Sequence, residues 1–198
     1  MVYESMLMKP HLVAIGTSLG GTAALQVLLP TLPPDFPAAV ALVFHRAQGA
    51  DDTLVRFLRK HCRLPVEEAQ DKTPLQSGCL YFAPADYHLL VEGDHFALST
   101  EPPVSFARPS IDVLFESVAD VYAANAVGVV LTGAGHDGAE GLAAIKRRGG
   151  LTIVQSPATA ESRHMPDAAL ATGQVDKVLP IEEIVPFLTK WGINRSVA

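Results

Sequence analysis

Short apolar runs that alternate with longer helical segments constrain the fold of this chain more than any other feature. Residues 12–15 and 40–44 are almost continuously apolar, which is typical of parallel strands that helices cover on both faces. Residues 22–29, between these runs, have the length and composition of a helix. Because strand–helix–strand units of this kind build parallel sheets, we predict an α/β fold: a doubly wound, mainly parallel sheet flanked by helices.

The middle of the chain interrupts this alternation. Residues 87–91 and 95–99 flank Gly93 and Asp94, which predicts an antiparallel hairpin on the otherwise parallel sheet. Further strands are expected at residues 80–82, 127–131, 151–154 and 175–178, and further helices at 51–62 (capped by Asp51 or Asp52), 110–125, up to 148, and 181–190.

One domain is the simplest organisation, because the chain has no internal repeat and no long linker. Hydrophobic residues make up 48% of the 198 residues and charged residues 18%, so we expect a sizeable core and little disorder. The expected division is a leader at residues 1–10, the folded domain at 11–192 and a tail at 193–198.

Charge and cysteine usage exclude several classes of function. The formal net charge is −6 and there is no dense Lys/Arg block, whereas nucleic-acid binding relies on neutralising phosphates. No apolar stretch approaches the ~20 residues of a membrane span, and the N-terminus lacks a secretory pattern. Cys62 and Cys79 are not spaced for zinc or for a disulfide framework. We expect a cytoplasmic protein without metal, nucleic-acid binding or membrane insertion.

Ser18 is the first candidate for chemistry, in the loop after the first predicted strand. Residues 16–21 read GTSLGG and match the G-x-S-x-G pattern, in which small neighbours allow a tight turn that exposes a nucleophilic hydroxyl. The N-terminus of the next helix could stabilise an oxyanion. Two alternatives are a helix-capping serine and a phosphate-binding loop, although the phosphate-loop motifs are missing.

His45 and Asp137 follow two other predicted parallel strands. Loops at the carboxyl ends of such strands can converge on one crevice. A histidine there can activate a serine hydroxyl, and Asp137 either orients that histidine or caps the following helix. His136 is the reserve candidate for the base. The other five histidines, which include His164, are expected at ordinary surface or core positions. Four of them are expected away from the crevice: His11, His61, His88 and His95.

Longer motifs make the chain recognisable. Residues 15–21 (IGTSLGG), 108–115 (RPSIDVLF) and 125–133 (NAVGVVLTG), followed by Asp137-Gly138 and Met165-Pro166, resemble motifs of the bacterial protein-glutamate methylesterase/glutamine deamidase of chemotaxis. The motifs occur in the order found in that family. The resemblance covers roughly residues 11–190 and corresponds to the catalytic domain of the family.

The resemblance implies a serine hydrolase that demethylates glutamate γ-methyl esters and deamidates glutamines on chemotaxis receptors, without a cofactor. Its triad falls on Ser18 as nucleophile, His45 as base and Asp137 as orienting acid. Its oxyanion donors fall on the backbone N–H groups of Leu19 and Ala134. The order Ser, His, Asp differs from that of α/β-hydrolases, so the G-x-S-x-G match does not imply that fold.

The chain departs from the family pattern at three positions around the site. Leu19 replaces a common Thr, Arg46-Ala47 replaces Met-Pro after the histidine, and Ala134 replaces a Met. Backbone donors survive such replacements, whereas the shape of the pocket depends on them. These departures are the best support for the alternative of a non-catalytic module that keeps the fold and binds receptors or signalling proteins, whereas retention of all three triad residue types counts against it. A nucleotide-binding domain is a weaker alternative, because the phosphate fingerprint is missing.

The expected partner is the helical signalling region of a methyl-accepting receptor. Arg56, Arg59, Lys60 and Arg63 share one face of the helix predicted at residues 51–62, and could attract an acidic helix or form an ordinary solvated face. The typical family member begins with a receiver domain, for which ten residues before the first strand are too few. We therefore expect a catalytic domain whose receiver is either absent by nature or removed from this chain. If it is absent by nature, we expect control by a separate partner or by expression level.

Overall fold

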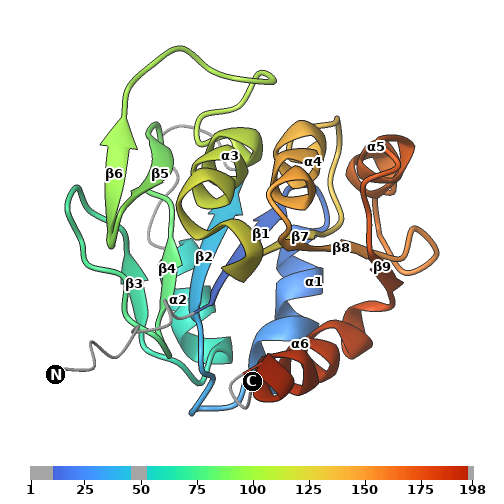
Figure 1. Ribbon diagram of the computed structural model, residues 1–198, viewed down its shortest axis with the longest axis horizontal. Coiled ribbons are helices and arrows are strands. Elements are labelled where there is room, and N and C mark those ends of the chain that lie inside the picture. The colour runs from blue at the N-terminus through green and yellow to red at the C-terminus, as the bar shows by residue number, and fades with distance from the viewer. Residues whose placement is uncertain (1–10, 46–52, 196–198) are drawn as a thin grey trace, which may run out of the picture.

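A computed structural model describes residues 11–45 and 53–195 of the chain. Its central sheet has seven parallel strands in the order β3-β4-β2-β1-β7-β8-β9 (Figure 1). The strands are β1 Leu12–Thr17, β2 Ala39–Phe44, β3 Val66–Glu68, β4 Leu80–Phe82, β7 Ala126–Val130, β8 Leu151–Gln155 and β9 Lys177–Leu179. The chain builds outward from β1 on one side and then returns to β7 on the other. Such a change of direction is where open α/β sheets place their binding crevice.

Helices cover both faces of the sheet (Figure 1). They are α1 Gly21–Leu28, α2 Thr53–His61, α3 Ile111–Tyr122, α4 Ala139–Arg147, α5 His164–Ala171 and α6 Ile181–Arg195, with 3₁₀ turns at Leu29–Thr31 and Ala123–Asn125. Leu12 and Ala14 of β1 pack into the core under α3, α4 and α5, whereas Val13 and Ile15 pack into the core under α1, α2 and α6. Burial on both faces explains why this strand is apolar at consecutive positions.

The predicted α/β fold is confirmed, and most predicted elements lie within one to three residues of the observed ones. Two elements were not predicted. β3 is a three-residue edge strand in which two exposed glutamates hide the apolar pattern. α5 contains Pro166, which reads as a helix breaker but sits in the first turn, where its missing N–H is not needed.

The predicted hairpin is present as β5 His88–Glu92 and β6 His95–Ser99. Its predicted place on the parallel sheet is wrong, because it forms a separate two-stranded sheet. The hairpin packs against α3, where the N–H of Val91 donates a hydrogen bond of 3.0 Å to Ser117 Oγ. Apolar residues of both strands thereby join the core under α3.

The ends of the chain lie largely outside the described residues. The expected leader at residues 1–10 and the expected helix caps Asp51 and Asp52 are not described, while α6 continues to Arg195 and thus enters the expected tail. Within residues 11–45 and 53–195, no helix is both long and apolar enough to cross a membrane.

Candidate active site

Ser18, His45 and Asp137 lie in the loops that follow β1, β2 and β7, at the carboxyl edge of the sheet. Backbone hydrogen bonds continue the strand pairing into these loops. The N–H of His45 donates to the carbonyl of Thr17 at 3.0 Å, and the N–H of Ser18 donates to the carbonyl of Thr132 at 3.1 Å. The Ser18 backbone is therefore held between the His45 segment and the loop that leads to Asp137.

The turn after Ser18 shows that this serine does not cap α1. The N-cap is Gly20, in the left-handed conformation at φ 80° and without a side-chain hydrogen bond. That conformation favours glycine, because it carries no Cβ. The carbonyl of Ser18 accepts a hydrogen bond of 2.9 Å from the N–H of Gly21, which leaves the hydroxyl of Ser18 unused in the cap.

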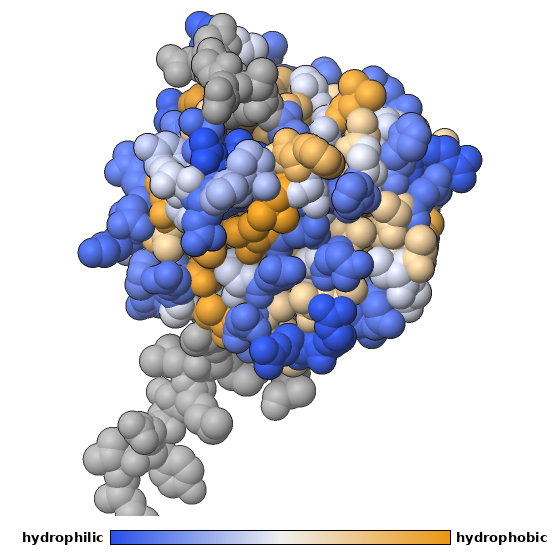
Figure 2. All heavy atoms as spheres, turned by 90° about the horizontal axis from the view of Figure 1, so that it is seen from above, coloured by the Kyte–Doolittle hydropathy of each residue, from blue (hydrophilic) through white to orange (hydrophobic). Residues whose placement is uncertain are grey.

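Ser18 is half-buried and lines a hollow of about 490 Å³ together with Leu19, Phe44 and Glu161. This volume is in the range of small-molecule sites, so one substrate side chain fits easily. Figure 2 views this edge of the molecule from above and shows hydrophobic residues in the middle, with hydrophilic residues around them. The side chain after the serine, Leu19, is 57% exposed beside the hollow.

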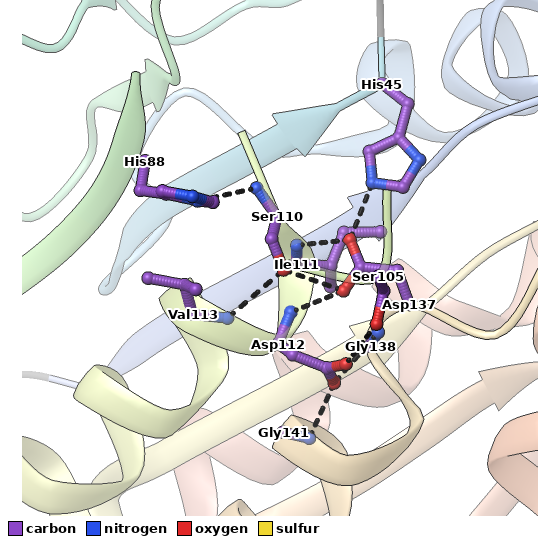
Figure 3. Close-up of polar contacts among 10 residues, drawn as sticks. All are labelled: His45, His88, Ser105, Ser110, Ile111, Asp112, Val113, Asp137, Gly138 and Gly141. Atoms are coloured by element: carbon purple, nitrogen blue, oxygen red, sulfur yellow. Dashed lines mark hydrogen bonds and ion pairs between the residues drawn. The ribbon is translucent and has the colours of Figure 1, made fainter. Parts of the chain in front are cut away.

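A close hydrogen bond joins the predicted base and acid. His45 Nε2 lies 2.7 Å from Asp137 Oδ2, with the aspartate side chain 2% exposed (Figure 3). Burial would raise the pKa of Asp137, but the hydrogen bond from His45 and the N–H groups of Asp112 and Ile111 outweigh it and hold that pKa below its ordinary value. The ionised carboxylate can only accept hydrogen bonds, so Nε2 of His45 carries the proton.

Asp137 caps α3, not the helix that follows it in sequence. Its carboxylate accepts hydrogen bonds from the N–H of Ile111 at 2.7 Å, the N–H of Asp112 at 3.0 Å and the hydroxyl of Ser110 at 2.8 Å (Figure 3). The next helix, α4, has Gly138 as its N-cap. A negative charge at the positive end of a helix is favourable, so α3 stabilises the ionised form of Asp137.

A second buried carboxylate lies beside Asp137. Asp112 accepts hydrogen bonds from the N–H of Gly138 at 2.9 Å and of Gly141 at 2.8 Å, at the start of α4 (Figure 3). Burial and the like charge of Asp137 raise the pKa of Asp112 to about 6, against the lowering effect of these N–H groups. The start of α3 thus donates to Asp137, which lies two residues before α4, and the start of α4 donates to Asp112 of α3.

The histidines that compete with His45 lie in different surroundings. His136 is exposed, and its side chain has no hydrogen-bond partner in the part of the chain that the structure describes. His88, which was expected at a core or surface position away from the crevice, is buried, and its Nδ1 accepts the N–H of Ser110 at 3.2 Å (Figure 3). The remaining histidines contact groups outside this network: His11, His61, His95 and His164.

Sequence reasoning missed the residues that surround Asp137. Ser110, Asp112 and His88 had no predicted role, although the segment 108–115 was singled out as a family motif. The motif therefore marked this segment, but the sequence did not indicate that its residues bind Asp137. Among the described residues, no three His, Cys, Asp or Glu side chains are grouped as metal ligands. Arg46 and Ala47, two of the departures from the family, lie outside the described residues.

Sequence comparisons match this chain to one family. The family model described as CheB methylesterase matches residues 13–188. A protein from Leptospira interrogans, assigned as a protein-glutamate methylesterase/protein-glutamine glutaminase, is 45% identical over 95% of this chain and 98% of its own length. Protein-glutamate methylesterase/protein-glutamine glutaminase 2 from Anaeromyxobacter dehalogenans is 46% identical over 89% of this chain. The match covers 52% of the length of that relative.

A solved structure gives the same result. The catalytic domain of the CheB methylesterase from Thermotoga maritima is 32% identical and superposes with a TM-score of 0.89, over 92% of this chain and 99% of that domain. The separate two-stranded sheet and the seven-stranded parallel sheet thus belong to a known catalytic fold. Sequence and structure agree that the chain belongs to the CheB methylesterase family.

Proposed function

We propose that this chain is a protein-glutamate methylesterase that hydrolyses γ-methyl esters of glutamates on chemotaxis receptors, and the γ-amide of glutamines, through Ser18, His45 and Asp137. The observation that carries the proposal is the 2.7 Å hydrogen bond between His45 and Asp137, at the sheet edge where Ser18 follows β1. The activity named for the relatives from Leptospira and Anaeromyxobacter supports the choice of ester and amide.

The hydrogen bond to Asp137 assigns the base to one nitrogen of His45. Because Nε2–H donates to the carboxylate, the neutral ring leaves Nδ1 unprotonated. In the reaction, Ser18 Oγ attacks the γ-carbonyl carbon and its proton passes to Nδ1. The ionised Asp137 stabilises the imidazolium that forms. In the chymotrypsin triad Nδ1 donates to the aspartate and Nε2 is the base. In this proposal the two nitrogens have the opposite roles.

In this proposal, two backbone N–H groups stabilise the oxyanion. Leu19 directly follows Ser18 in the sequence, and Ala134 lies in the loop after β7. Neither of their backbone N–H groups has a hydrogen-bond partner within the described ranges. Each such donor is worth ~3 kcal/mol to the transition state in other hydrolases. Side-chain replacement at either position leaves the donor in place.

The reaction then completes in two steps. The tetrahedral intermediate expels methanol, which takes the proton from Nδ1 of His45, and leaves the glutamyl ester of Ser18. A water molecule gives its proton to Nδ1 and attacks the same carbonyl carbon. Collapse releases the free glutamate and returns the proton to Ser18 Oγ. Ammonia replaces methanol as leaving group when the substrate is glutamine.

Surface charge supports a role for α2 in docking the receptor. Arg56, Arg59, Lys60 and Arg63, here called the basic stripe, are all exposed, and in the part of the chain that is described none has an ion-pair partner. Arg63 was predicted to share a face of this helix, but it lies two residues after the end of α2. Unpaired cations of this kind attract an acidic helix over long range.

Replacement of the nucleophile tests the proposal. Ser18→Ala should abolish methanol release from methylated receptor and labelling by a fluorophosphonate. The thermal midpoint should change little, because the hydroxyl does not cap α1. Ser156→Ala is the matched control, since Ser156 directly follows β8, another parallel strand of the same sheet. Full turnover by Ser18→Ala would end the proposal, and a wild-type protein that binds receptor without either reaction would favour the non-catalytic module.

A further inference from the structure

Asp112, the second residue of α3, connects the two helices that meet at Asp137. Its backbone N–H donates to Asp137 Oδ1 at 3.0 Å. Its carboxylate oxygen Oδ1 accepts the N–H groups of Gly138 at 2.9 Å and Gly141 at 2.8 Å. One residue therefore binds the side chain of Asp137 through its backbone and the peptide after Asp137 through its side chain.

This arrangement satisfies backbone groups that have no partner inside a helix. The first N–H groups of every helix need an acceptor, and buried ones are costly to leave unsatisfied. Asp137 supplies that acceptor to α3, and Asp112 supplies it to α4. The two caps depend on each other, because Asp112 belongs to the first turn of α3, which binds Asp137, and Asp137 directly precedes the peptide group that binds Asp112.

The start of α4 fits against α3 without space for adjustment. A Cβ at Gly141 would lie 2.9 Å from the Cα and the carbonyl oxygen of Asp112, and 2.6 Å from Phe115 Cβ. Gly138 has a left-handed backbone at φ 94°. Its N–H, the first group after Asp137, is fixed by the Asp112 carboxylate. Asp112 thus fixes the backbone next to Asp137, and with it the orientation of the Asp137 side chain toward His45.

We propose that Asp112 is a positioning residue of this site, which holds Asp137 in hydrogen-bonding distance of His45 by accepting the N–H groups of Gly138 and Gly141. The inference rests on the proposed function and adds a residue that touches neither substrate nor His45. It acts through its acceptor oxygen and not through its charge. Both donors bind Oδ1, so an amide in the same place can accept both.

The test compares three substitutions at this position. Asp112→Asn keeps an acceptor oxygen and loses the charge, Asp112→Ala loses both, and Asp112→Glu keeps the charge but moves the oxygens by one methylene. For Asp112→Ala we expect kcat to fall on the order of 10–100-fold per folded molecule with KM little changed, because displacement of a catalytic group by ~1 Å has effects of this size. Asp112→Asn should stay within about threefold of wild type, since its geometry survives.

A second readout separates positioning from a loss of structure. The acidic limb of the kcat/KM profile reports protonation of the base. In Asp112→Ala this limb should move to lower pH, because a displaced Asp137 stabilises the imidazolium less. Asp176→Ala is the matched control: Asp176 also accepts a backbone N–H, that of Thr152 at 3.0 Å, at the amino end of β8. It should lower the thermal midpoint without changing kcat or the profile.

The outcomes separate this inference from the proposed function. Wild-type kcat and pH profile in Asp112→Ala, or equal losses in Asp112→Ala and Asp112→Asn, would overturn the positioning role. If Asp112→Ala does not fold, Asp112→Asn must be more active than Asp112→Glu, and the reverse order overturns the inference. An active Ser18→Ala, measured alongside, would instead overturn the proposed function whatever the Asp112 variants do.

Discussion

Replacement of Asp137 by asparagine confronts four hydrogen-bond donors with an amide that has one oxygen. In the native site, Oδ2 accepts from His45 and Ile111, and Oδ1 accepts from Ser110 and Asp112. The NH₂ group of an asparagine must face one of these pairs. Each pair contains one partner that can adapt, His45 or Ser110, and one backbone N–H that cannot.

The size of the effect follows from this geometry. Either orientation leaves one buried backbone N–H against an NH₂ group, which costs ~1–3 kcal/mol. For a chain of this length, each kcal/mol lowers the thermal midpoint by ~2–4 °C, so Asp137→Asn should melt about 2–12 °C below wild type. If the NH₂ group faces His45, the ring must accept at Nε2 and protonate Nδ1, and the base is lost. The corresponding change in a protease triad lowers kcat ~10⁴-fold.

The assay is methanol release from methylated receptor, with thermal unfolding followed on the same preparations. Asp176→Asn is the control, because it changes an acceptor of a backbone N–H at the amino end of the sheet. We expect Asp137→Asn to fold and to be nearly inactive. A variant that keeps more than about a tenth of wild-type kcat would refute the role of the ionised carboxylate in orienting His45, since that role requires losses of several orders of magnitude.

Three further predictions address the base, the receptor surface and the pH dependence of stability. His45→Ala should lose most activity on methylated receptor while His136→Ala keeps it; the opposite result would move the base to His136. Reversal of the three arginines of the basic stripe to glutamate should slow turnover of intact receptor and reduce its salt dependence, but leave a small ester substrate unaffected; equal rates on receptor would make the stripe an ordinary solvated surface. The pKa of Asp112 is raised from 3.8 to about 6 in the fold, so its contribution to stability is fully present below pH ~3.8 and is lost as the pH rises through ~6. The thermal midpoint of Asp112→Asn relative to wild type should therefore be higher at pH 8 than at pH 5, and a difference that does not vary with pH would contradict the costly charge.

Local pattern was sufficient for the fold class and for the central strands of the sheet. The apolar runs of β1, β2 and β7 predicted parallel strands because both faces of those strands are buried, and burial of both faces is written into consecutive residues. The loops after parallel strands lie at one edge of the sheet, which predicts that Ser18, His45 and Asp137 lie close together. The family motifs added the expected role of each of the three.

Only the tertiary structure decided how Asp137 is held and which nitrogen of His45 it binds. The alternative to the orienting role was that Asp137 caps the helix that follows it, but it caps α3, whose first residue lies 26 positions earlier. Hydrophobic periodicity carries no information about such a contact, because the free N–H groups at a helix start accept any correctly placed oxygen, whatever its position in the sequence. The close packing of α3 on α4 brings Asp137 to the start of α3 and Asp112 to the start of α4, and the packing of β5 on α3 brings His88 to Ser110. That packing is a property of the assembled layers, and with it the geometry of the site is set.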